Sequence, residues 1–155
     1  MAVQRSNSFF VHLLICLLAF FWAAELRAKE PTVKSGLIDL TDWDFERDGW
    51  IPLSGDYEFY WRQHLNATDF LKIEAPGQDY VYVPAAWNDN EIGGETLTGI
   101  GFATYRVNVL VSHRETLALK LPDLGTAYRV IIDGNEKFGA GQIGTTPEST
   151  IPAYR

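Results

Sequence analysis

The side chains in this sequence whose chemistry suits a small ligand are aromatic rings that stand beside hydrogen-bonding groups. They are Trp87, Asn88, Arg106, Tyr128 and Arg129. An aromatic ring covers the apolar C–H face of a sugar, while amide and guanidinium groups take its hydroxyls. We therefore expect Trp87 and Tyr128 to provide stacking surfaces, and Asn88, Arg106 and Arg129 to provide hydrogen bonds. The alternative left open by the residues is that these rings pack in the core.

The residue types needed for catalysis or metal binding do not come together in this sequence. No serine lies in a Gly-x-Ser-x-Gly elbow, and no pair of carboxylates stands out as acid and base. His64 and His113 are far apart, with no cysteine to help complete a zinc site. The acidic run Asp44–Gly49 departs from a calcium loop at Glu46 and at Gly55. We predict a non-catalytic domain without cofactor or metal, and a looser calcium site at the acidic run is the alternative.

The first 28 residues have the composition of a secretory signal peptide. Arg5 gives a short positive segment, an uncharged run follows at Phe9–Ala24, and Ala28 is a suitable last residue before a cleavage site. The alternative is an uncleaved membrane anchor, but the run is slightly short for a span of about 20 residues. We expect residues 29–155 to be exported as one domain. The single cysteine, Cys16, lies in the signal, so we expect no disulfide in the mature domain.

The charge of the chain argues against one class of partner. The 155 residues carry a formal net charge of −7. An acidic chain repels phosphate backbones, so we do not expect nucleic acid as a partner. Apolar residues make up 46% and charged residues 21%, as in an ordinary folded domain, while aromatic residues at 14% exceed the usual level.

Short segments of alternating polarity, separated by Gly, Pro, Asp and Asn, must position these side chains. The expected strands are Gly36–Leu40, Gly55–Gln63, Asp79–Pro84, Thr98–Val111, Thr116–Pro122 and the two arms of Ala127–Gly139. The last two arms are expected to turn at Asp133-Gly134, and Asn66–Lys72 is expected to form one helical turn. Many short strands at this spacing indicate an all-β sandwich or barrel.

The alternation also predicts which side of each strand is buried. In the second strand, one face carries Tyr57, Phe59 and Trp61, and the other carries Asp56, Glu58 and Arg62. In the fourth, the side expected to face a core carries Tyr105, Val107, Val109 and Val111. The side expected to face water or a ligand carries Arg106, Asn108 and Leu110. The side chains expected to be buried in the fifth are Leu117, Leu119 and Leu121.

The order of several segments resembles a known family. These segments are "WDFERDGWIPLSGDYEFYW", "YVYVPAAWN", "GIGFATYRVNVLV", "LALKLPDLGTAYRVIIDG" and "GQIGTT". Over about Leu37–Arg155 they look like the N-terminal extracytoplasmic sensor domain of bacterial membrane-bound signalling proteins. That family includes seven-transmembrane receptors with diverse intracellular signalling modules, and related cyclases and histidine kinases. The resemblance implies a galactose-binding-like jelly-roll β-sandwich. Two of the segments, "VPAAWN" and "GFATYRVNV", are also similar to the sugar-binding domain of family-two glycoside hydrolases.

The resemblance implies a periplasmic ligand-sensing module that binds a carbohydrate or another small solute. The parent protein would be tethered to the inner membrane and would continue into membrane helices and a cytoplasmic output domain. This sequence stops before the strands that close the family's sandwich, so we expect an incomplete jelly roll with an unpaired edge and an exposed apolar face. One alternative is a carbohydrate-binding accessory domain of an exported glycoside hydrolase. The other is a structural or protein-binding sandwich in which Arg106 and Arg129 make charge-assisted hydrogen bonds.

Overall fold

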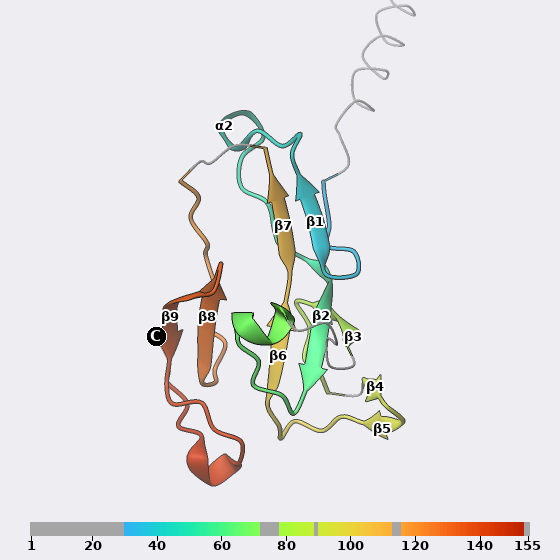
Figure 1. The fold of residues 1–155 in the computed structure, drawn as a ribbon, viewed down its shortest axis with the longest axis vertical. Helices are drawn as coiled ribbons and strands as arrows, with labels where there is room; N and C mark the ends of the chain where they lie inside the picture. The colour runs from blue at the N-terminus through green and yellow to red at the C-terminus, as the bar shows by residue number, and fades with distance from the viewer. Residues whose placement is uncertain (1–29, 72–77, 89, 113–115, 154–155) are drawn as a thin grey trace, which may run out of the picture. The chain divides into compact units, whose positions relative to one another are not determined.

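The computed structural model describes residues 30–153 apart from 72–77, 89 and 113–115 (Figure 1). From Pro31 onward these residues belong to one unit of the chain. The expected signal peptide and His113 lie outside the described residues. The described part is mostly strands with one short α-helix, so the all-β prediction is confirmed. None of its helices is long and apolar enough to span a membrane.

Nine strands form four small sheets in the described part of the chain. The strands are β1 (Leu37–Leu40), β2 (Gly55–Trp61), β3 (Asp79–Val83), β4 (Glu91–Ile92), β5 (Glu95–Thr96), β6 (Ala103–Arg106), β7 (Asn108–Val111), β8 (Tyr128–Ile132) and β9 (Asn135–Ala140). The helical elements are α2 (Phe45–Asp48) and the 3₁₀ turns η1 (Ala67–Leu71) and η2 (Pro147–Ser149). The sheets have the orders β3-β2-β6, β1-β7, β4-β5 and β8-β9.

Strand β2 is the centre of the three-stranded sheet and pairs antiparallel with both β3 and β6. Both of its faces are covered, since Phe59 on one face and Tyr60 on the other are fully buried. Phe59 packs with Val81 and Leu97, and the half-buried indoles around them extend this cluster. The expected alternation is therefore present, but the side that carries Glu58 is also partly closed.

The expected strand Thr98–Val111 is divided at Val107. Its first part, β6, pairs with β2, and its second part, β7, pairs in parallel with β1. Val107 packs against the buried cluster of Val33, Ile38 and Leu40. The prediction that Tyr105, Val109 and Val111 are buried is wrong, because these side chains are 37%, 39% and 41% exposed. Alternation identified the two sides of β7, but burial also requires a second layer, and β1 covers only an edge of this strand.

The predicted strand Thr116–Pro122 is absent, and this prediction is wrong. The segment has no regular secondary structure, and Leu117 and Leu119 are 46% and 41% exposed. A strand forms only where a neighbour satisfies its backbone N–H and C=O groups. No backbone hydrogen bond joins this segment to another part of the described chain. Its leucines therefore have the right period for a strand but lack a partner.

The predicted hairpin at Ala127–Gly139 is confirmed. Strands β8 and β9 pair antiparallel, with an irregularity between Val130 and Ile131. Asp133 and Gly134 have φ angles of 48° and 78°. Two successive left-handed residues form the type I′ turn whose twist matches that of the two strands.

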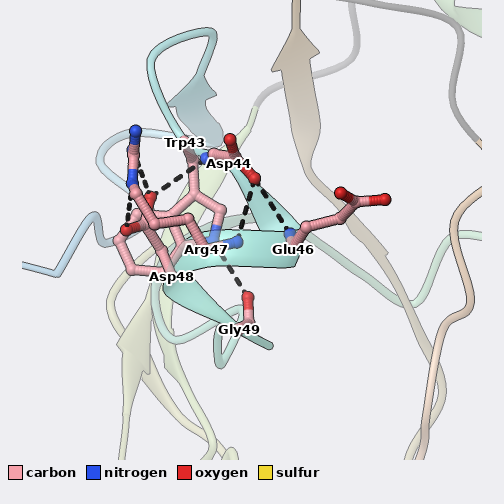
Figure 2. Close-up of polar contacts among 6 residues, drawn as sticks. All are labelled: Trp43, Asp44, Glu46, Arg47, Asp48 and Gly49. Atoms are coloured by element: carbon pink, nitrogen blue, oxygen red, sulfur yellow. Dashed lines mark hydrogen bonds and ion pairs between the residues drawn. The ribbon is translucent and has the colours of Figure 1, made fainter.

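The acidic run before Trp50 forms the single turn of α2, which is held by polar contacts (Figure 2). The Asp44 carboxylate accepts hydrogen bonds from the backbone N–H groups of Glu46 and Arg47, both at 3.0 Å. The Arg47 guanidinium donates to both carboxylate oxygens of Asp48 and lowers the pKa of that carboxyl to about 2. These carboxylates are thus engaged by the chain itself. Among the described residues, no group of three or more His, Cys, Asp or Glu is placed to hold a metal ion.

Replacing Asp44 with alanine is expected to destabilise the domain by about 1 kcal/mol, because it removes the N-cap acceptor of α2. Chemical denaturation followed by tryptophan fluorescence measures this difference. Asp44→Asn keeps a side-chain oxygen at the cap and is the control, which we expect to stay close to wild type. An alanine variant as stable as the asparagine variant would contradict a capping role.

Candidate functional site

One face of the sheet β3-β2-β6 brings together polar and aromatic side chains from all three strands. The register places Glu58 of β2 opposite both Tyr80 of β3 and Arg106 of β6, and it places Asp56 opposite Tyr82. Side chains two residues apart on a strand share a face. We call this surface the polar face and define it by Asp56, Glu58, Tyr60, Gln78, Tyr80, Tyr82 and Arg106.

The centre of the polar face is a buried carboxylate. Glu58 is 7% exposed and accepts hydrogen bonds from the Tyr60 hydroxyl at 2.8 Å and from Nη1 of Arg106 at 3.0 Å. Nη2 of Arg106 donates to Oδ1 of Asn108 at 3.3 Å, and the Asn108 amide donates to the Gly36 carbonyl at 3.3 Å. A buried charge is tolerated only when it is paired and hydrogen-bonded in this way. Arg106 is thus committed to holding Glu58.

Two elements shield this ion pair. The Phe70 ring of η1 lies 4.6 Å from the Arg106 guanidinium carbon and contacts the Tyr60 ring edge-on at 5.3 Å. In Figure 1 the green turn of η1 lies in front of the sheet near β6. On another side, a Cβ on Gly36 would lie 2.5 Å from Cγ of Glu58, so the Gly36 backbone presses on this side chain. The Glu58–Arg106 pair therefore packs against neighbouring elements and contributes to the fold, as well as lying on the polar face.

The β3 side of the polar face is open. Tyr80 and Tyr82 are 44% and 57% exposed. The Gln78 amide donates to the Tyr80 hydroxyl at 2.7 Å, and its carbonyl oxygen accepts from the Tyr60 hydroxyl at 3.4 Å. Gln78 thus connects the buried tyrosine to an exposed one. Exposed rings beside amide and carboxylate groups can stack on a ligand and hydrogen-bond to its hydroxyls.

Burial raises the pKa of three tyrosines of this sheet, Tyr57, Tyr60 and Tyr105, and the shift is large for the last two. Burial and the hydrogen bond to Glu58 raise the pKa of Tyr60 to about 12. On the opposite face, burial raises the pKa of Tyr105 to about 12, and its ring packs edge-on against Phe59 with centroids 5.0 Å apart.

These raised pKa values predict a loss of stability at alkaline pH. In the unfolded chain the Tyr60 and Tyr105 hydroxyls ionise near pH 10, whereas in the folded chain they keep their protons to about pH 12. The unfolded state therefore loses protons first. The stability contributed by the two groups is complete below about pH 10 and is lost as the pH rises to about 12.

Urea denaturation at a series of alkaline pH values, together with tyrosinate absorbance, measures this effect. Tyr105→Phe removes one of the two groups and should flatten the fall in stability with pH. Native-state titration of every tyrosine near pH 10 would contradict the prediction.

The site residues predicted from the sequence lie in three places. Arg106 lies on the polar face. Trp87 is half-buried against Trp61, with ring centroids 5.4 Å apart, and its indole N–H donates to the Thr98 carbonyl at 2.8 Å. Asn88 is exposed next to it. Trp87 thus has the packing role that the sequence left open as the alternative.

Tyr128 and Arg129 lie on β8, where they pair in register with Ala140 and Gly139. Arg129 makes an ion pair with Glu136 of β9 at 3.5 Å. The ion pair of Arg129 is thus made within the β8-β9 hairpin. Of the five predicted residues, Arg106 is the one that belongs to the polar face.

Most residues of the polar face were not predicted as site residues, although the sequence contains a signal for them. In "QDYVYV" the side chains Gln78, Tyr80 and Tyr82 share one phase of the alternation, and Val81 and Val83 share the other. The same pattern was recognised in β2. What the sequence did not show is that β3 and β6 lie on either side of β2.

Comparison with known proteins finds no matching family model, no matching curated protein and no matching solved structure. Function must therefore be argued from the residues of the site, because a fold alone does not determine an activity.

Proposed function

We propose that this chain is a non-catalytic ligand-binding module that holds a carbohydrate, or a similar small polyhydroxylated solute, on the polar face. The observation that carries the proposal is the pair of exposed rings, Tyr80 and Tyr82, beside the hydrogen-bonding groups of Gln78 and Asp56. The buried Glu58–Arg106 pair holds the strands beneath them in register. Stacking rings with adjacent polar groups suit a sugar better than they suit an apolar ligand.

The proposal includes the place of the module in a larger protein. We propose a galactose-binding-like jelly-roll sandwich exported to the periplasm, which acts as the sensor domain of a membrane-tethered signalling protein. The all-β architecture, the signal-like sequence of residues 1–28 and the segment order of the sensor family support this. Ligand binding would then shift the population of conformations that the parent protein adopts. Sequencing the N-terminus of the exported chain tests the signal.

Removing the two rings is expected to abolish most of the binding. We expect Tyr80→Ala/Tyr82→Ala to lower the affinity of the full-length chain for its best ligand by about tenfold or more. Calorimetric titration against a panel of neutral mono- and oligosaccharides and osmolytes measures this. Trp50→Ala is the matched control, because Trp50 is an exposed aromatic residue outside the polar face. Equal losses in the two variants, or no binding by the wild type at millimolar ligand, would overturn the proposal.

A structural or protein-binding role is the second candidate, and specific contacts favour it. Arg106 and Arg129 make their ion pairs within the chain, with Glu58 at 3.0 Å and with Glu136 at 3.5 Å. Trp87 is likewise engaged in packing. Under this reading, Trp87→Ala and Tyr80→Ala/Tyr82→Ala would change stability or protein association, and no small solute would bind.

A further inference from the structure

The charges of the polar face restrict which sugar it can hold. Arg106 is the only lysine or arginine in strands β2, β3 and β6. Its guanidinium is engaged by Glu58 and Asn108, and one of its flanks is covered by Phe70. Among the described residues of these strands, no cation is therefore left to neutralise a carboxylate or phosphate on a ligand.

The remaining charge on this face is negative. Asp56 is exposed and lies in register with Tyr82, which is the more exposed of the two rings. An anionic ligand stacked on Tyr82 would approach this carboxylate, and the net charge of −7 on the whole chain adds to the repulsion. A neutral ligand can instead donate its hydroxyl protons to Asp56, because a carboxylate is a strong acceptor.

The spacing of the Tyr80 and Tyr82 rings sets a minimum length for a ligand that contacts both. Tyr80 and Tyr82 are two residues apart on one strand and face the same side, so their Cα atoms are about 7 Å apart. That separation exceeds the length of a single sugar ring. One ring of the ligand can therefore lie on each tyrosine, with the linkage between them.

We propose that the polar face selects neutral oligosaccharides of at least two rings and rejects acidic ones. This inference rests on the proposed function and specifies the ligand of the same site. Tyr80 and Tyr82 hold adjacent rings, Asp56 accepts hydroxyl hydrogen bonds and excludes carboxylates, and the Glu58–Arg106 pair keeps the strands in register without contributing a free charge.

Calorimetric titration of the full-length chain tests this with probes of equal length. The neutral probes are the hexaoses of glucose in α and β linkage, of xylose and of mannose, with the corresponding monosaccharides. The acidic probes are the hexamers of galacturonate and of mannuronate. At least one neutral hexaose should bind about tenfold more tightly than either acidic hexamer, and the monosaccharides should bind more weakly than that hexaose.

A charge reversal at Asp56 tests directly whether this carboxylate excludes acidic ligands. Asp56→Lys should raise the affinity for the acidic hexamers about tenfold, whereas Asp42→Lys, which makes the same charge change at an exposed residue outside the polar face, should not. Acidic hexamers that bind as tightly as neutral ones would overturn this inference and leave the proposed function standing. Monosaccharides that bind as tightly as hexaoses would overturn the two-ring arrangement. Failure of every sugar to bind would overturn both the proposed function and this inference.

Discussion

Gly55→Ala is expected to leave the domain largely unfolded. Gly55 begins β2, is buried, and has a φ of 135°, which residues with a side chain rarely adopt. A Cβ at this position would lie 2.1 Å from the carbonyl oxygen of Val33, which is itself in the core. The Val33 backbone is fixed by hydrogen bonds to Ser54 at 2.8 Å and to Asp56 at 3.0 Å, so it cannot retreat. We expect a loss of about 4 kcal/mol or more, which is most of the stability of a marginal domain.

Circular dichroism and thermal melting of the purified chain measure this effect. Gly93→Ala is the matched control, because Gly93 also has a positive φ, at 59°, but an added Cβ would meet nothing within 4 Å. We expect the control to lose only about 1 kcal/mol, the cost of the left-handed backbone alone. If the Gly55 variant melted at the temperature of the Gly93 variant, the close approach of β2 to Val33 would be refuted.

The second large effect is expected from Arg106→Ala. This variant leaves the Glu58 carboxylate buried, with the Tyr60 hydroxyl as its remaining partner among the contacts described above. Removing one member of a buried ion pair costs about 3–5 kcal/mol. We expect the lower end of that range, about 3 kcal/mol, because the Arg106 side chain is 36% exposed while that of Glu58 is 9% exposed.

A double-mutant cycle separates the charge effect from lost packing. Glu58→Gln removes the charge, so Arg106→Ala/Glu58→Gln should be more stable than Arg106→Ala alone. Arg129→Ala is the control, because its ion pair with Glu136 is exposed on both sides and contributes less than about 1 kcal/mol. Denaturant unfolding measures all four variants. A double variant no more stable than Arg106→Ala would mean that the loss of stability does not come from the unpaired Glu58 carboxylate.

The elements that local chemistry controls were predictable from the sequence. Strands β2 and β3 follow from alternation, and the β8-β9 hairpin follows from Asp133-Gly134, whose preference for left-handed backbone acts within two residues. For Leu117 and Leu119, local alternation predicted burial that the structure does not have. Their spacing is that of a buried strand, yet they are exposed. Burial depends on a neighbouring layer, and a local pattern contains no information about that layer.

The candidate site was predictable to a smaller extent, for a related reason. Arg106 was identified from its residue type, but its partner Glu58 lies 48 positions away and depends on the register of β2 with β6. Trp87 was chosen as a stacking surface, and its indole is held in the packed cluster instead. Residue type indicated the chemistry, whereas strand pairing determined which groups meet.

The division at Val107 gives the domain a mechanical linkage. Residues 103–111 run without a loop from the sheet that carries the polar face into the parallel pair with β1, so a single residue separates the two. Arg106 and Asn108 flank that residue and touch each other, and Asn108 also holds Gly36 just before β1. The two sheets are therefore joined by one short covalent segment and, across Val107, by the hydrogen bonds of Arg106 and Asn108. Flexible spacers inserted at Val107 would break that linkage while leaving each sheet its own hydrogen bonds.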